Sequence, residues 1–418
     1  MHLRSLAGAA LISCIGFAAM AQPRTNLLSQ WADGSDAAAI AKLGDMFTAA
    51  GGVWQQTSIA GHTANTLAKL RADVVAGDAP PAVQLKGPEI AEWNATGMTA
   101  SIEPLAEKEG WDKVVAPELL SVMKPKGVWV AVPMNIHRVN WLWASPKAMA
   151  AAGIAGMPKT WAEFNSDCEK LVAAKLICIA HASSDWTDQT TFDAVVYGMD
   201  IDLYRHAFVE GDPAALRSAG MVRAFAQLRR MVNWMDPGIS GRAWDAAMAM
   251  MTSGKAGFFI MGDWAIGTLN AGGFKAGTDY LCAQTPADWG KTGYILNADS
   301  VVFFKQKNKD FIDGQQLLAH IIMSPQFQTV FNQAKGSIPA RMDVDLSHGF
   351  TSCQQASQKD LQESIAAGTL VRSLAHNMTV LQKYRGAMME VVTEFVNKPD
   401  MTPEAATKQL ADAVEAQM

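Results

Sequence analysis

Short apolar strands alternate with helical segments along this chain, and this alternation constrains the fold more than any other feature. Strands are expected at 26–31, 52–57 and 82–85, with helices over 37–50 and 64–76 between them. Strands that alternate with helices of this size are typical of βαβ units around a parallel sheet. The sequence therefore predicts an α/β protein.

The same pattern restarts after the apolar segment 128–133. It predicts strands at 138–145, 176–181 and 258–261, and helices at 161–175, 214–235, 242–253, 312–334 and over most of 361–418. A chain of 418 residues is long enough for roughly two domains. Because no Pro- or Ser-rich linker separates the halves, we expect the chain to cross between two α/β domains more than once.

The first 21 residues have the features of a secretory signal. Arg4 precedes an apolar run over 6–20, and Ala19-Met20-Ala21 is a small-x-small cleavage site. We predict cleavage after Ala21 and export to the periplasm. The alternatives are a membrane anchor, for which the run is short, and a lipid attachment at Cys14.

Export leaves four cysteines in an oxidising compartment, where an even number suggests disulfides. Three pairings are possible, and free buried thiols are the alternative. We favour Cys168–Cys178, which would tie a helix to the strand after it, together with Cys282–Cys353. The formal net charge of −5 argues against a nucleic-acid-binding protein.

Motifs that would indicate an enzyme are missing from the sequence. It has no G-x-G-x-x-G after a strand, no H-E-x-x-H, no C-x-x-C and no G-x-S-x-G. We therefore expect no metal, no cofactor and no catalytic residue. A glycosidase-type carboxylate pair needs no local motif, so a secreted hydrolase stays as an alternative.

Tryptophan is the residue type that points to a function. Of 13 tryptophans, Trp31, Trp264 and Trp186 lie in polar or glycine-flanked segments with aspartates nearby. Ligands bind at strand ends in open α/β sheets, and a flat indole suits the apolar face of a sugar ring. Core packing is the alternative for each one. Four others lie on amphipathic patterns and are assigned to the core: Trp54, Trp111, Trp161 and Trp234.

Six segments in order resemble the extracellular solute-binding proteins of ABC sugar importers, most closely the periplasmic glucose-binding branch and more distantly maltose-binding protein. They are 30–36, 82–87, 132–143, 254–264, 296–304 and 335–341. The resemblance implies a two-lobe clamshell that closes on a sugar, with crossings near 135–139, 296–300 and 337–341. It places residues 22–136 and 299–338 in the N-terminal lobe, and 137–298 and 339–418 in the C-terminal lobe.

The resemblance also implies a set of ligand-binding residues. Carried over position by position, they are Trp31, Asp36, Lys86, His137, Trp264, Asp299, Lys335 and His376. Two positions depart from the family pattern. Gln30 replaces a second tryptophan, and Asp36 stands where glucose-binding proteins commonly have glutamate. These departures bear on which sugar is bound.

By this resemblance we expect a monomeric, non-enzymatic binding protein that takes up a monosaccharide, glucose first, and passes it to an ABC permease in the membrane. A disaccharide, a glycoside or another polyol is the alternative ligand. Each site residue also has a structural alternative. Lys86 and Lys335 could be surface lysines, His137 and His376 structural histidines, and Asp36 a charge that favours a helix N-terminus.

Overall fold

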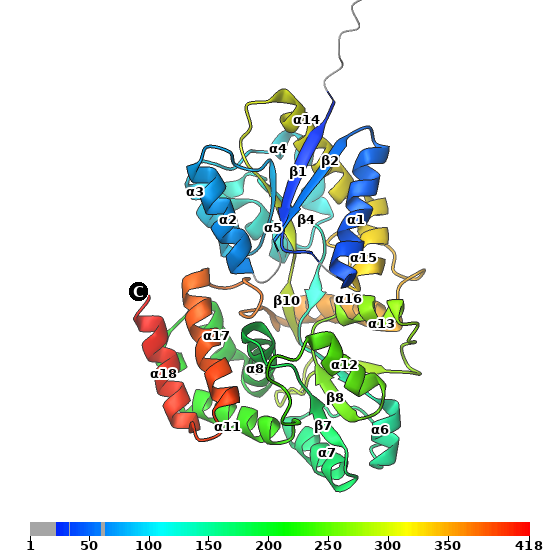
Figure 1. Cartoon of the computed structure of the whole chain (residues 1–418), viewed down its shortest axis with the longest axis vertical. Helices are drawn as coiled ribbons and strands as arrows, with labels where there is room; N and C mark the ends of the chain where they lie inside the picture. The colour runs from blue at the N-terminus through cyan, green and yellow to red at the C-terminus, as the bar shows by residue number, and fades with distance from the viewer. Residues whose placement is uncertain (1–21, 33, 60–62) are drawn as a thin grey trace, which may run out of the picture.

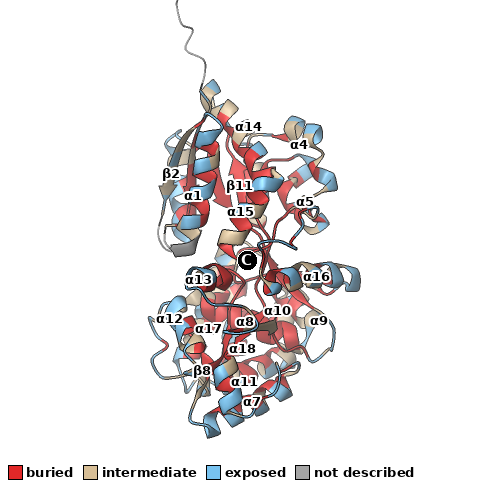
Figure 2. Cartoon of the chain, turned by 90° about the vertical axis from the view of Figure 1, so that its right-hand side faces the viewer, coloured by how far each residue is buried: buried red, intermediate tan, exposed pale blue. Residues whose placement is uncertain are grey.

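The computed structural model describes residues 22–32, 34–59 and 63–418, which form two bodies stacked along the long axis (Figure 1). The predicted signal peptide lies outside the described residues. Each body has its own sheet and its own apolar core, with buried strands inside and exposed helix faces outside (Figure 2). This arrangement confirms the predicted α/β fold of two lobes.

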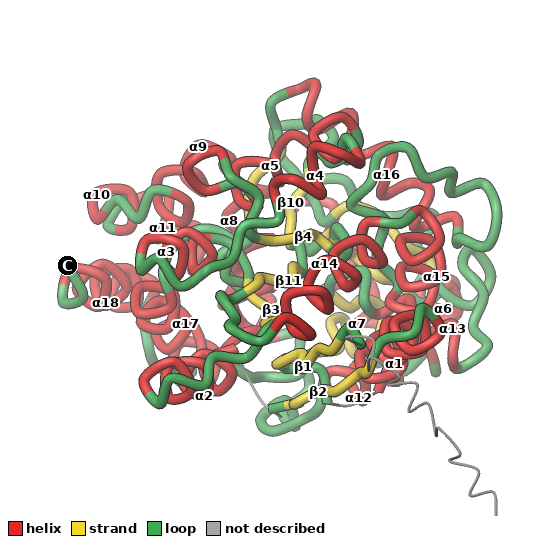
Figure 3. Tube along the Cα trace, turned by 90° about the horizontal axis from the view of Figure 1, so that it is seen from above, coloured by secondary structure: helices red, strands yellow, loops and turns green. Residues whose placement is uncertain are grey.

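The upper lobe is built around a sheet in the order β2-β1-β3-β11-β4. Its strands are β1 (Arg24–Ser29), β2 (Val53–Ser58), β3 (Ala82–Leu85), β4 (Ala131–Pro133) and β11 (Ser300–Phe303). Its helices are α1 (Gly34–Ala49), α2 (Thr63–Val75), α3 (Pro88–Ala95), α4 (Glu103–Glu109), α5 (Pro117–Met123), α14 (Lys309–Met323) and α15 (Pro325–Lys335), with short turns η1 (Trp111–Lys113) and η2 (Pro125–Gly127). Seen from above, the strands lie between α2 and α3 on one side and α1 and α15 on the other (Figure 3).

The lower lobe is built around a sheet in the order β7-β8-β6-β9. Its strands are β6 (Trp141–Ala144), β7 (Ile177–Ala180), β8 (Ala256–Ile260) and β9 (Leu281–Gln284). Its helices are α6 (Pro146–Ala151), α7 (Trp161–Ala173), α8 (Asp185–Met199), α9 (Ile201–Tyr204), η3 (Arg205–Val209), α10 (Pro213–Leu216), α11 (Ala219–Asn233), α12 (Trp244–Thr252), α13 (Ala265–Ala271), α17 (Gln382–Asn397) and α18 (Pro403–Glu415).

A small sheet in the order β12-β10-β5 lies between the lobes, next to α16 (Ser352–Ala367). Its strands are β5 (His137–Arg138), β10 (Tyr294–Asn297) and β12 (Leu370–Arg372). On the first passage between lobes, Ile136 packs in the upper core and Val139 in the lower one. On the return, Ile295 packs below and Leu296 above.

The third passage is less abrupt. Ile338 forms a bridge with Ile136, yet Val344 and Phe350 still pack in the upper core and Val371 is in the lower one. The change of core is therefore spread along α16. The lobe boundaries carried over from the family stay predictions.

Some predicted elements differ from the observed ones. The helix predicted over 312–334 is two helices, because Pro325 lacks the amide hydrogen that a continuous helix needs and Ser324 caps α15 instead. Ser218 similarly starts α11 within the predicted helix 214–235. The sheets are also mixed rather than parallel. β1 pairs in parallel with β2 and β3, whereas β11 and β6 pair antiparallel with their neighbours.

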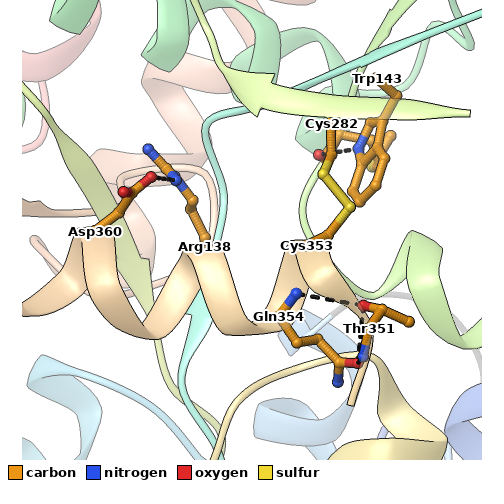
Figure 4. The surroundings of a disulfide bond; sticks show 8 residues. Arg138, Trp143, Cys282, Thr351, Cys353, Gln354 and Asp360 are labelled. Atoms are coloured by element: carbon orange, nitrogen blue, oxygen red, sulfur yellow. Dashed lines mark hydrogen bonds and ion pairs between the residues drawn. A yellow bond between two sulfur atoms is a disulfide. The ribbon is translucent and has the colours of Figure 1, made fainter. Parts of the chain in front are cut away.

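Both predicted disulfides are present. Cys168 of α7 bonds to Cys178 of β7, and Cys282 of β9 bonds to Cys353 of α16. Figure 4 shows the second bond beside the ion pair between Arg138 and Asp360, which also joins the small sheet to α16. This disulfide therefore fastens the sheet of the lower lobe to the helix along which the third passage takes place.

None of the helices in the described part of the chain is both long and apolar enough to cross a membrane. The four tryptophans assigned to the core behave as expected. Trp111 and Trp161 are buried, and Trp54 and Trp234 pack against the upper and lower cores.

Removing the longer disulfide is expected to cost more stability than removing the shorter one. The cysteines of Cys282–Cys353 are 71 residues apart and those of Cys168–Cys178 are 10 apart. A longer closed loop removes more freedom from the unfolded chain, by about 2 kcal/mol for this ratio. Urea unfolding of the two double Cys→Ser variants measures the difference. Equal losses, or a larger loss at Cys168–Cys178, would contradict it.

Candidate functional site

The eight residues predicted to bind a ligand meet between the lobes. Loops after strands and the ends of helices carry them. Trp31 follows β1, Lys86 follows β3, His137 starts β5, Trp264 precedes α13, Asp299 joins β10 to β11, Asp36 is in the first turn of α1, Lys335 ends α15 and His376 follows β12. Six of them are buried, whereas Asp36 and His376 are partly exposed.

The carboxylate of Asp299 is the centre of this set. It is 1% exposed and accepts hydrogen bonds from four donors. Lys86 Nζ lies 2.6 Å away and Gln84 Nε2 3.2 Å away, both at Oδ1, while Asn135 Nδ2 at 2.9 Å and His137 Nε2 at 3.1 Å contact Oδ2. Burial alone would raise the pKa of Asp299, but Lys86 and His137 hold that pKa well below its usual range.

His137 joins the two lobes electrostatically. Its Nδ1 contacts Asp263, which precedes α13 in the lower lobe, and its Nε2 contacts Asp299. Burial and the charge of Lys335 would lower the pKa of His137, but the two carboxylates raise it above its usual value. In the imidazolium form the ring donates a hydrogen bond to each carboxylate. The Asp263 carboxylate also accepts a hydrogen bond from the backbone amide of Arg138 at 2.9 Å. A carboxylate from each lobe therefore contacts the first passage between the lobes.

Lys335 links the set to Trp31. Its ammonium group is 2.7 Å from Asp36 Oδ1 and lies 5.2 Å from the centre of the Trp31 ring. Burial alone would lower the pKa of Lys335, but Asp36 and Asp299 raise it. Lys335 is therefore a buried cation in front of an aromatic face, and the centre of the Trp31 ring also lies 5.7 Å from that of Phe331.

Trp264 and His376 form the aromatic side in the lower lobe. The centre of the Trp264 ring lies 5.4 Å from that of His137 and 4.9 Å from that of His376. Trp186, in the first turn of α8, lies 6.1 Å from both Trp264 and His376. Burial and the cations Lys86 and Arg385 lower the pKa of His376 well below its usual value, so this ring is neutral at pH 7.

The structure bears on the structural alternatives for five of these residues, whereas Trp31 and Trp264 lie in the apolar cores, as their core-packing alternative requires. Lys86 and Lys335 are not surface lysines, since they are 7% and 3% exposed. His137 has partners at both ring nitrogens, whereas Nε2 of His376 is buried with none. Asp36 is in the first turn of α1, as the helix-charge alternative required, and it also pairs with Lys335.

Other residues of the site were not identified from the sequence. Asp263 stands next to Trp264 in the quoted segment 254–264, and Asn135 and Gln84 also lie in quoted segments, so position in these segments was a usable signal. Glu89 gave no such signal. It follows Lys86 by three residues and is 1% exposed, and burial raises its pKa to about 8.

The arrangement is suited to binding a neutral, hydroxyl-rich molecule. Carboxylates and ammonium groups make hydrogen bonds to hydroxyls that are stronger than neutral ones, and indole faces cover apolar C–H groups. Within the described residues, no group of His, Cys, Asp and Glu side chains could hold a metal ion.

Two α/β lobes with polar and aromatic side chains between them are the architecture of a protein that binds a solute between its lobes. Comparison with known sequences makes the assignment specific. The chain belongs to the bacterial extracellular solute-binding protein family, whose sequence profile matches residues 25–358. This is a family of binding proteins, in agreement with the expectation that the chain is not an enzyme.

Relatives of nearly equal length support the assignment. A "probable sugar-binding periplasmic protein" of Rhizobium meliloti is 38% identical over 400 residues, which cover 96% of this chain and 95% of the relative. A protein of the same description from Brucella suis is 37% identical over 98% of this chain and 97% of its own. These relatives and the predicted export place the protein in the periplasm.

Solved structures share the fold at low identity. A chitin oligosaccharide binding protein superposes with a TM-score of 0.82 at 16% identity, covering 94% of this chain and 98% of its own. The solute receptor AcbH, described as exclusive for β-D-galactopyranose, gives a TM-score of 0.78 at 17% identity over 95% and 99% of the chains. These matches confirm the two-lobe fold.

The buried carboxyl of Glu89 is expected to make stability fall as the pH rises from about 4.5 to about 8. In this window the unfolded chain releases the proton and the folded chain keeps it, so rising pH favours unfolding. The slope from one such group is at most about 1.4 kcal/mol per pH unit. Urea unfolding between pH 5 and 8 measures it, with Glu89→Gln as the variant that cannot titrate.

Two other groups have raised pKa values: burial raises the pKa of Asp193 to about 6, and the pKa of His137 is raised by its carboxylate partners. Both groups titrate in the variant as well as in the unchanged chain, so their effects cancel when the two stability curves are compared. Parallel stability curves for the variant and the unchanged chain would show that Glu89 is ionised in the folded state.

Proposed function

We propose that this chain is the substrate-binding protein of an ABC sugar importer, which holds one monosaccharide between its lobes and delivers it to the membrane permease. The observation that carries the proposal is that eight residues scattered from position 31 to position 376 gather between the lobes in two groups of contacts, which the charge of Lys335 couples to each other. The relatives described as probable sugar-binding proteins support the choice of ligand class.

The chemistry of the site matches a sugar on both faces and around its edge. Trp31 belongs to the upper lobe and Trp264 to the lower lobe, so closure brings two indoles toward one ring. Asp299 and Asp36 would accept hydrogen bonds from hydroxyls, while Lys86 and Lys335 would donate them. A hydroxyl of the wrong configuration would leave a buried group unpaired, at a cost of about 1–3 kcal/mol.

Glucose is the proposed ligand among the monosaccharides, on the resemblance to glucose-binding proteins. Without a sugar, Lys86 pairs with Asp299 and Lys335 with Asp36. A sugar that enters must therefore replace these ion pairs with bonds of similar strength. This requirement favours a compact ring with hydroxyls on several sides, and a monomer suffices because both lobes come from one chain.

Calorimetric titration with D-glucose tests this function. The chain without residues 1–21 is unfolded to release any bound sugar, refolded and titrated. We expect a one-to-one isotherm with Kd on the order of 1 μM. Trp31→Ala and Asp299→Asn should each weaken binding about tenfold or more, because they remove an aromatic face and the central acceptor.

Matched control variants lie outside the site. Trp54→Ala removes a tryptophan that packs on the upper core, and Asp313→Asn removes an acid from the exposed pair with Lys309. Both should bind as the unchanged chain does. If the folded chain prefers a disaccharide or a glycoside over glucose, that ligand takes the place of the monosaccharide in the proposal. A chain that binds no sugar of a broad panel would refute the proposal.

A further inference from the structure

Several buried polar atoms on the segments that carry Lys86 and His376 have no hydrogen-bond partner in another residue. In the described part of the chain, they include both carboxyl oxygens of Glu89, both amide atoms of Asn377 and Nε2 of His376. Glu89 and Asn377 are each 1% exposed. Because buried polar groups are nearly always hydrogen-bonded, such a cluster calls for a partner that protein atoms do not supply.

These residues meet where the two lobes touch. Gly87 has φ +48°, and a Cβ atom at this position would lie 2.0 Å from the carbonyl oxygen of Asn377. The backbone of Gly87 in the upper lobe therefore lies directly against the backbone of Asn377 and Met378. Only glycine permits an approach this close, so the contact is built into the sequence.

Arg385 connects the two segments from behind. Its guanidinium group donates to the carbonyl oxygen of Ala375 from Nε at 3.1 Å and from Nη2 at 2.6 Å. Its charge also acts on the carboxyl of Glu89, although burial has the larger effect and leaves that group protonated at pH 7. Glu89 can therefore donate as well as accept a hydrogen bond, as the amide of Asn377 can.

The backbone at Asn377 argues against a purely structural role. Its φ is +59°, in the left-handed region where glycine is the unstrained choice. Asparagine tolerates this region, usually with its side chain bonded locally. Here the side chain makes no such bond and is buried, so neither local folding nor solvent explains its presence. Trp186 borders the same edge of the site through its contact with His376.

We propose that Glu89 and Asn377 are specificity-determining residues that hydrogen-bond the hydroxyls on the edge of the bound sugar nearest Lys86 and His376. The proposal rests on the proposed function and adds the requirement for free hydroxyls on that edge.

Calorimetry on a series of sugars tests this assignment. The probes are D-glucose, its epimers galactose and mannose, and the 2-, 3-, 4- and 6-deoxy derivatives of glucose. Asn377→Gly removes the amide and keeps the left-handed backbone. Glu89→Leu removes the carboxyl, and Glu89→Gln keeps one donor and one acceptor. Circular dichroism and thermal melting establish that each variant is folded.

We expect Asn377→Gly and Glu89→Leu to weaken glucose binding about tenfold, and Glu89→Gln to restore most of the loss. The difference in affinity between variant and unchanged chain should disappear for the deoxy sugar that lacks the hydroxyl bound by the substituted residue. The unchanged chain could bind glucose while these variants match it on every sugar, or lose the same factor in affinity on all sugars. In that case buried water or packing explains these atoms, and the inference is wrong although the proposed function stands. If the unchanged chain binds no sugar of the series, the proposed function fails with it.

Discussion

A buried carboxylate with four hydrogen-bond donors is the constraint on which the rest of this structure depends. An isolated charge at the position of Asp299 would be prohibitively unfavourable. The donors come from β3, the loop after it and the first passage between the lobes. The fold must therefore hold three separate segments against one carboxylate, and it does so where the strands of the upper sheet end. The same donors leave Asp299 charged and correctly placed for a guest that carries hydroxyls.

The passages between the lobes are stiffened around this centre. His137 contacts a carboxylate from each lobe. The next residue, Arg138, is fully buried between the rings of Trp141 and Tyr294 and pairs with Asp360 of α16. With the disulfide Cys282–Cys353 on the same helix, these contacts tie the small sheet and the lower sheet to α16.

Much of the fold could be predicted from the sequence, because apolar periodicity and cysteine spacing are local signals. The prediction missed the helix breaks at Ser324 and Ser218, because the apolar pattern continues across both N-cap residues. Seven of the eight predicted site residues came from the ordered family segments, and His376 was carried over from outside them; all eight lie between the lobes. Glu89 and Asn377 were not found, because what marks them is a missing partner and a close backbone contact between distant segments. Neither can be read from residue type or spacing.

The most direct test of this account is a crystal structure of the chain saturated with D-glucose. The account predicts one sugar ring between Trp31 and Trp264, with a hydroxyl within hydrogen-bond distance of the Asp299 carboxylate and Lys86 or Lys335 turned toward the sugar. A sugar bound elsewhere, with Lys86–Asp299 and Lys335–Asp36 still paired to each other, would contradict it.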